Sequence, residues 1–109
     1  MLHRTRKAIV LTGGAALAVA LRTNREILGV LRETGGGAVM SSEEEIVRAT
    51  FDLAKMGLYV EPTAAQAAAA FGKLLAAGTI TTDQTTVIVL TGSGLKATPR
   101  IAELLGVTL

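Results

Sequence analysis

Hydroxyl side chains and glycines stand together at Thr91-Gly92-Ser93-Gly94, directly after the apolar run Val87–Leu90. Two glycines one residue apart permit positive φ and let a ligand approach the backbone closely. The run before them is rich in β-branched residues, which is typical of a strand buried on both faces of a parallel sheet. Open α/β sheets bind ligands just beyond the carboxyl ends of their strands. Thr91 and Ser93 therefore lie where a cofactor would be met, although on this stretch alone a plain strand followed by a glycine-rich turn is the simpler interpretation.

Helices are expected to surround this stretch. The helical spacing of apolar residues predicts them over 25–33, 43–55 and 63–77, with a short last one from Pro99 to Leu105. Asn24 can cap the first, Ser42 and Glu45 form a capping box for the second, and Pro62 suits a first turn. The buried face of the second helix is expected to consist of Ile46, Ala49, Thr50 and Leu53.

Short apolar segments predict the strands. Residues 7–12 and 38–40 are expected to be strands, and Ala15–Leu21 a helix between them. The glycines Gly35–Gly37 are interpreted as a helix C-cap followed by a turn. We therefore expect a single helix-rich α/β domain over residues 1–109, in which Val87–Leu90 is the most buried strand.

The composition narrows the classes of function. The 109 residues suffice for one modest domain, and the only aromatic residues are Phe51, Phe71 and Tyr59. Stacking on nucleic-acid bases is therefore poorly supported, and we expect no nucleic-acid partner. With no cysteine and a single histidine, His3, we expect neither a disulfide nor a metal site.

The amino-terminal end allows two further interpretations. Its basic start and the small apolar residues of Ala8–Leu21 resemble the first two parts of a secretory signal, although the run is too short to span a bilayer. Strand, glycines and helix around Thr12-Gly13-Gly14 also outline a phosphate-binding turn, without the full dinucleotide spacing. Close packing of strand and helix is the simpler interpretation. We expect a cytoplasmic chain without a membrane partner.

Two motifs in a fixed order resemble a known family. The first is Leu58-Tyr59-Val60-Glu61-Pro62-Thr63-Ala64-Ala65, and the second is Val89-Leu90-Thr91-Gly92-Ser93-Gly94-Leu95-Lys96. Together they resemble the carboxyl-terminal segment of threonine synthase and its relatives, which are pyridoxal-phosphate enzymes of fold type II in the tryptophan synthase β-subunit superfamily. Residues 27–36, 38–39 and 42–46 also match the family. The resemblance covers residues 25–109 and implies a fragment of a doubly wound open sheet with few, mostly parallel strands.

The resemblance also implies roles for individual residues in binding pyridoxal phosphate. A Ser or Thr at the position of Thr91 hydrogen-bonds the pyridine nitrogen of the cofactor in this family, and a neutral hydroxyl makes the ring a milder electron sink than a carboxylate would. Gly92 and Gly94 let the backbone turn beside the ring, and Ser93 lies between them. Glu61 is expected near the cofactor pocket, and its alternative role is a carboxylate at the positive end of a helix.

Other parts of the family's machinery cannot be placed in this sequence. The Schiff-base lysine and the phosphate loop belong to the earlier part of the complete enzyme, so no residue here is assigned as catalytic. The resemblance implies a lyase fragment of amino-acid biosynthesis, inactive alone, whose complete form would make threonine and phosphate from O-phosphohomoserine. The alternatives are a non-catalytic binding or assembly module and a small nucleotide-binding protein. Exposed apolar surface would favour a homo-oligomer, or a partner chain that supplies the missing part.

Overall fold

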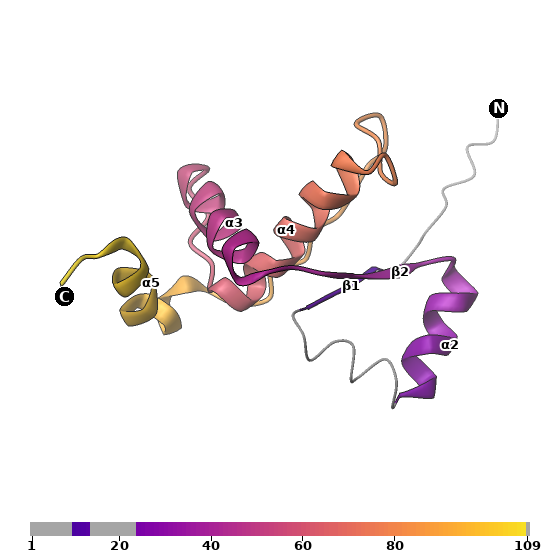
Figure 1. Cartoon of the computed structure of the whole chain (residues 1–109), viewed down its shortest axis with the longest axis horizontal. Coiled ribbons are helices and arrows are strands. Elements are labelled where there is room, and N and C mark those ends of the chain that lie inside the picture. The colour runs from indigo at the N-terminus through magenta and orange to yellow at the C-terminus, as the bar shows by residue number, and fades with distance from the viewer. Residues whose placement is uncertain (1–9, 14–23, 109) are drawn as a thin grey trace. The chain divides into compact units, whose positions relative to one another are not determined.

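The computed structural model of the protein describes residues 10–13 and 24–108. The chain divides into two compact units, Met1–Met40 and Ser41–Leu109, and each is described by itself (Figure 1). The single domain expected from the chain length stays a prediction.

The described residues of the first unit form two parallel strands and a helix. Strand β1 (Val10–Gly13) pairs with β2 (Gly37–Met40), with Val10 opposite Gly37 and Gly13 opposite Met40. Helix α2 (Arg25–Thr34) lies in the connection, as a parallel pair requires a long crossover. The predicted strand over residues 38–40 is confirmed. The predicted strand over 7–12 is confirmed where it is described, whereas residues 7–9, Gly14 and the predicted helix Ala15–Leu21 lie outside the described residues.

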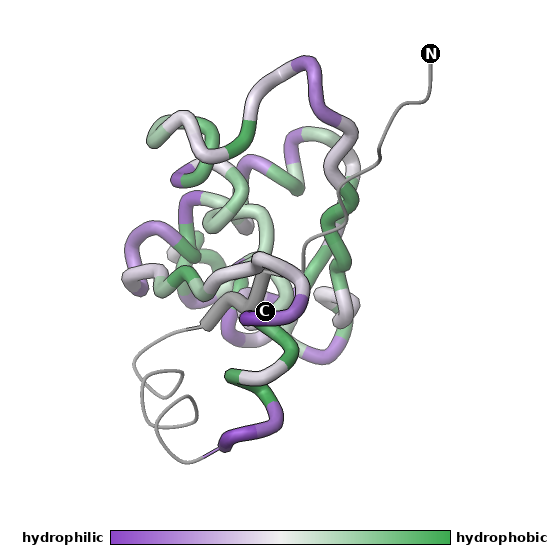
Figure 2. The backbone as a smooth tube through the Cα atoms, turned by 90° about the vertical axis from the view of Figure 1, so that its right-hand side faces the viewer, coloured by the Kyte–Doolittle hydropathy of each residue, from purple (hydrophilic) through white to green (hydrophobic). Residues whose placement is uncertain are grey.

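Both ends of α2 follow from its sequence. The Asn24 side-chain oxygen accepts hydrogen bonds from the backbone N–H groups of Glu26 and Ile27 at 3.1 and 3.2 Å. The helix begins with hydrophilic residues and continues with hydrophobic ones (Figure 2). It ends at Gly35, whose φ of 68° lies in the left-handed region that glycine adopts without strain. The predicted C-cap is therefore confirmed.

The second unit is built on two packed helices, α3 (Glu43–Lys55) and α4 (Pro62–Ala76) (Figure 1). The four residues predicted for the buried face of α3 are all buried. In α4 the buried residues are alanines, Ala64, Ala65 and Ala70, whereas Phe71 is only half-buried. Small side chains let the two helices approach closely, and the core is completed by Val60 and by Leu90.

The unit ends in two short helical segments. A 3₁₀ turn, η1 (Gly94–Ala97), leads directly into α5 (Thr98–Leu105), which confirms the predicted last helix. Among the described residues, no helix is long and apolar enough to cross a membrane.

The predicted central strand is wrong in its burial and its pairing. Val87 and Val89 are 83% and 66% exposed, and residues 87–90 form no strand. The physical reason is the absence of a neighbouring strand among the described residues of this unit, so that only Leu90 reaches the core between α3 and α4. The chain is helix-rich, with one pair of strands in its described part, and the doubly wound sheet stays a prediction.

Candidate functional site

The two sequence motifs, far apart along the chain, meet in space. The backbone N–H of Glu61 donates to the carbonyl of Gly92 at 3.1 Å, and the N–H of Gly94 donates to the carbonyl of Tyr59 at 2.9 Å. These two hydrogen bonds flank an antiparallel bridge between Val60 and Ser93. We call the two paired segments, Tyr59–Glu61 and Gly92–Gly94, the motif corner. The corner lies at the start of α4 and of η1.

Glu61 and Gly92 contact each other closely within the motif corner. A Cβ atom added to Gly92 would collide with the Glu61 carboxyl group and would lie 2.7 Å from its Cγ. Only glycine leaves room for the Glu61 side chain in this position. Glu61 also precedes Pro62 at the first turn of α4, without capping that helix through its side chain. Its carboxylate is therefore placed beside the glycine-rich loop.

Tyr59 holds the other end of the loop. Three atoms of its ring would lie 2.9 Å from a Cβ added to Gly94. Its hydroxyl lies 2.7 Å from the Oγ1 of Thr98. Because the Thr98 hydroxyl donates towards the carbonyls of Gly94 and Leu95, at 3.3 and 3.2 Å, the Tyr59 hydroxyl is the donor in this pair. The sequence analysis predicted no role for Tyr59 or Thr98. The presence of an aromatic residue, Tyr59, inside the first motif was the one signal that could have indicated a role.

The two hydroxyl residues of the loop differ in their partners. The Ser93 Oγ accepts a hydrogen bond from the N–H of Leu95 at 3.2 Å and thereby caps η1. Thr91 is exposed, and its neighbour Gly92 is fixed by the hydrogen bond from Glu61. The loop thus presents the Thr91 hydroxyl at the surface on an anchored backbone.

A hollow of about 280 Å³ adjoins Glu61. It lies between the starts of α3 and α4 and the region of α5, and two acidic residues, Glu43 and Glu61, line it together with Arg100. Arg100 forms ion pairs with Glu43 at 3.7 Å and with Glu103 at 3.2 Å. The hollow is small and mixed in charge, so it does not by itself define a ligand class.

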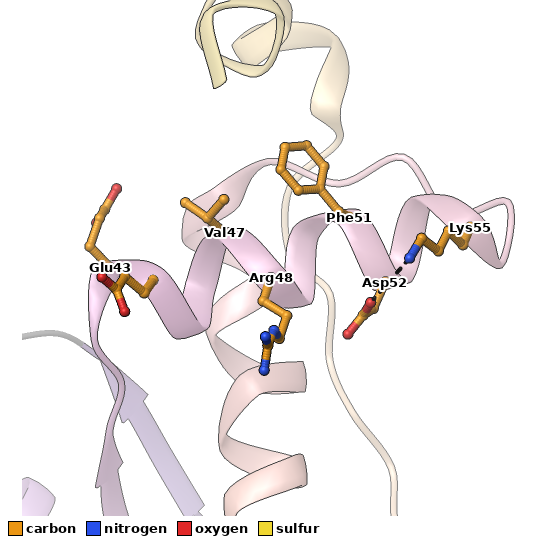
Figure 3. Close-up of a pocket in the computed structure, with 7 residues that line it drawn as sticks. Glu43, Val47, Arg48, Phe51, Asp52 and Lys55 are labelled. Carbon is orange, nitrogen blue, oxygen red and sulfur yellow. Dashed lines mark ion pairs between the residues drawn. The ribbon is translucent and has the colours of Figure 1, made fainter. Parts of the chain in front are cut away.

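A larger open groove of about 460 Å³ runs along α3 (Figure 3). Val47 and Phe51 point to the same side of the helix, and Arg48 points away from them. An ion pair of 4.0 Å joins Asp52 and Lys55 at the end of the groove. Exposed pairs of this kind contribute little stability. The charged residues that line the groove, such as Arg48 and Asp52, are not among the site residues predicted from the sequence.

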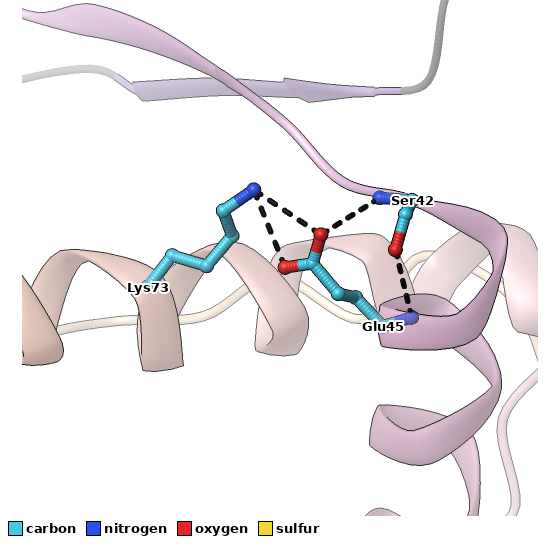
Figure 4. A network of polar contacts seen from close by, with 3 residues as sticks. All are labelled: Ser42, Glu45 and Lys73. Atoms are coloured by element: carbon cyan, nitrogen blue, oxygen red, sulfur yellow. Dashed lines mark hydrogen bonds and ion pairs between the residues drawn. The ribbon is translucent and has the colours of Figure 1, made fainter.

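A polar network fixes the start of α3 (Figure 4). The Ser42 Oγ accepts from the N–H of Glu45 at 3.2 Å, and the Glu45 carboxylate accepts from the N–H of Ser42 at 3.1 Å. This confirms the predicted capping box. The Glu45 carboxylate also pairs with Lys73 of α4 at 3.2 Å. The hydrogen bond from the Ser42 backbone, then those from the Ser42 hydroxyl and Lys73, lower the pKa of Glu45.

Metal binding has no candidate in the described ranges, 10–13 and 24–108. They contain no group of three or more His, Cys, Asp or Glu residues placed to hold a metal ion. Among the sequence-predicted residues, the structure brings Glu61, Gly92, Ser93 and Gly94 together in the motif corner, with Thr91 next to it.

The family profile described as pyridoxal-phosphate dependent enzyme matches residues 3–92, and the chain belongs to this family. The match includes Glu61, Thr91 and Gly92.

The chain is also similar to individual members of the family. It is 38% identical over 86 residues to the threonine synthase of Methanosarcina acetivorans, covering 73% of this chain and 21% of the relative. The threonine synthase of Methanocaldococcus jannaschii gives the same identity and coverage. The matched region thus spans about a fifth of the length of these curated relatives. No solved structure matches the chain.

Proposed function

We propose that this chain supplies one wall of the cofactor site of a threonine synthase-like, pyridoxal-phosphate dependent enzyme. In this proposal the Thr91 hydroxyl donates a hydrogen bond to the pyridine nitrogen of the cofactor. The observation that carries the proposal is the motif corner, where Glu61 lies against Gly92 next to the exposed Thr91. The family membership supports the use of pyridoxal phosphate.

The residues present fit this one contact of the cofactor. A hydroxyl is a neutral donor that can reach an aromatic nitrogen, and Thr91 is exposed beside a glycine without a Cβ. Bound pyridoxal phosphate supplies an electron sink for negative charge that develops on an amino-acid substrate. The neutral Thr91 donor orients the ring without forcing the nitrogen to stay protonated. The backbone N–H of Glu61 donates to the carbonyl of Gly92, the residue after Thr91, and Glu61 thereby helps to position Thr91.

The other residues that a complete cofactor site requires are not assigned to this chain. Neither the cofactor lysine nor the phosphate loop can be placed in its sequence by resemblance to the family. One hydrogen bond contributes about 0.5–1.5 kcal/mol, which is too little to hold a cofactor. We therefore expect the chain alone to form no threonine when it is mixed with pyridoxal phosphate and O-phosphohomoserine. Threonine formation by the purified chain would contradict this expectation.

A chimera tests the role of Thr91 directly. In the threonine synthase of Methanosarcina acetivorans, the segment aligned with this chain is replaced by the residues of this chain. Thr91→Val in the chimera removes the hydroxyl at similar volume, and the loss of one hydrogen bond should weaken cofactor binding about 2- to 12-fold. The measurement is a titration of the cofactor-free chimera followed by the cofactor's absorbance.

Thr85→Val is the matched control, because Thr85 is an exposed threonine before the apolar run. It should leave the affinity for pyridoxal phosphate unchanged. An unchanged affinity in Thr91→Val, or an equal loss in both variants, would show that Thr91 has no part in the cofactor site. A chimera that folds and binds no cofactor would contradict the proposed function as a whole.

A further inference from the structure

Helix α3 carries a row of four residues spaced four apart. The row begins with an acid, continues with two apolar residues and ends with a base: Glu43, Val47, Phe51 and Lys55. We call it the α3 ridge, because residues four apart form a continuous ridge on the surface of a helix. Figure 3 shows Val47 and Phe51 on the same side of the helix, with Glu43 near its start and Lys55 near its end. The ridge is distinct from the buried face of α3 that contributes to the core.

The α3 ridge borders the open groove of about 460 Å³. The other wall of the groove is the neighbouring row of the same helix, which consists of Glu44, Arg48 and Asp52. The apolar residues of the ridge are only half-buried, and the charged residues on both walls are exposed. A groove between two such rows is the kind of surface into which the ridge of another helix packs.

The order of residues makes the α3 ridge complementary to itself. A two-fold axis through its middle reverses its direction, so that Glu43 of one copy would lie beside Lys55 of the other. The same operation places Val47 beside Phe51. Packing of ridges of this spacing into each other's grooves is the most common class of helix contact. Opposite charges therefore meet at both ends, and apolar side chains meet in the middle.

We propose that the α3 ridge and its groove bind a second copy of this chain. The two α3 helices run antiparallel, and the ridge of each copy fills the groove of the other. The inference gives a specific surface to the homo-oligomer that the composition only favours. It goes beyond the proposed function and does not depend on it, because the residues that line the groove are separate from the motif corner.

The ion pairs within the chain do not compete strongly with this contact. Glu43 lies 3.7 Å from Arg100, and Lys55 lies 4.0 Å from Asp52. Both pairs are exposed, so their exchange for a charge of the second copy costs little. One helix face on each copy makes a small interface, below about 1,200 Å² in total. The dimer should therefore be weak and should form at high chain concentration.

Analytical ultracentrifugation of the full chain tests the proposal. We expect an equilibrium between monomer and dimer as the chain concentration rises from micromolar to millimolar. Lys55→Glu or Glu43→Lys places like charges at both ends of the contact. Because each variant removes two exposed ion pairs, it should weaken the dimer about 2- to 30-fold. Lys96→Glu is the matched control, since it makes the same charge change at an exposed residue of η1 and should leave the dimer unchanged.

Two charge exchanges test the antiparallel geometry. A mixture of the Glu43→Lys chain with the Lys55→Glu chain again pairs opposite charges at both ends, so the affinity should return to that of the parent. The double variant with both substitutions should also dimerise like the parent. Asp52→Asn should strengthen the dimer, because Asp52 lies near the Lys55 end and would face Glu43 of the second copy. Circular dichroism of each variant should match the parent and thereby exclude unfolding as the cause.

Three results would overturn the proposal. The first is a chain that stays monomeric at millimolar concentration. The second is a dimer that Lys55→Glu and Lys96→Glu affect equally. The third is a mixture of the two single variants that associates no better than either variant alone. None of these results bears on the proposed function, which the cofactor titration of the chimera tests separately.

Discussion

Gly94→Ala tests whether the motif corner is packed as described. The φ angle of Gly94 is not positive, so the cost of the substitution comes from space and not from backbone strain. The new methyl group would lie 2.9 Å from three atoms of the Tyr59 ring, well inside van der Waals contact. Overpacking of this kind costs about 1–3 kcal/mol.

Movement of the Tyr59 ring away from an added methyl group would cost free energy. Its hydroxyl donates to Thr98 at 2.7 Å, and its backbone carbonyl accepts the N–H of Gly94 at 2.9 Å. Swinging the ring out would sacrifice the first hydrogen bond, at about 0.5–1.5 kcal/mol. We therefore expect Gly94→Ala to lower the free energy of unfolding by about 1–3 kcal/mol, measured by urea denaturation with circular dichroism.

Two comparisons make this prediction specific. Gly72 is an exposed residue inside α4 with nothing within 4 Å of an added Cβ, so Gly72→Ala should stabilise the chain by about 0.5–1 kcal/mol. In a Tyr59→Ala background the ring is gone, and Gly94→Ala should lose most of its cost. A Gly94→Ala protein as stable as the parent, or a cost that persists without the ring, would refute the packing described for the corner.

Three further perturbations test the local structure. Ser42→Ala should lower the free energy of unfolding in urea by about 1 kcal/mol, because it removes the cap of α3. Ser41→Ala should not lower it, because the buried Ser41 hydroxyl has no hydrogen-bond partner among the described residues. Leu53→Ala should lower the free energy of unfolding by about 2–5 kcal/mol in the same assay, because it leaves a cavity in the core. Met56→Ala, at an exposed residue, should lower it by less than about 0.5 kcal/mol. Hydrogen bonds from Ser42 lower the pKa of Glu45, so its ionised form stabilises the fold above its unfolded pKa, and this stabilisation is lost as the pH falls through the lowered value. The stability advantage of the parent over Glu45→Gln should therefore shrink in acid titrations, and a difference independent of pH would contradict the pKa shift.

The helices could be predicted because their signals are local. Asn24, the pair Ser42 and Glu45, and Pro62 are caps or first-turn residues that act within one turn of the helix. Helical spacing sufficed to predict the buried face of α3. In α4, large apolar residues are a poorer guide to the buried face, because α3 packs closely on alanines such as Ala65, which is fully buried.

The strand at Val87–Leu90 could not be predicted correctly from its own residues. An apolar run of this kind is typical of a strand that has neighbouring strands on both edges and is covered on both faces. The described residues of the second unit provide only a helical core on one face, through Leu90. Burial of a strand depends on residues distant in the sequence, so a local pattern predicts its tendency and not its environment.

The candidate site was predictable in its members and not in its contacts. Thr91 was singled out by its place after the apolar run and Glu61 by resemblance to a family, and the profile match includes both. The glycine at position 92 was expected to allow close approach, and the group that approaches it is the Glu61 carboxylate. The contact between Tyr59 and Thr98 had no sequence signal, because a hydrogen bond between two hydroxyls 39 residues apart follows no short-range rule.

The central claim is that the Thr91 hydroxyl contacts the pyridine nitrogen of pyridoxal phosphate. The most direct measurement is the ¹⁵N chemical shift of ring-labelled cofactor bound to the chimera described above, because that shift reports hydrogen bonding and protonation at this atom. The claim predicts that Thr91→Val changes the shift of the ring nitrogen, whereas Thr85→Val leaves it at the value of the unsubstituted chimera. A ring-nitrogen shift that is identical in all three proteins would contradict the claim.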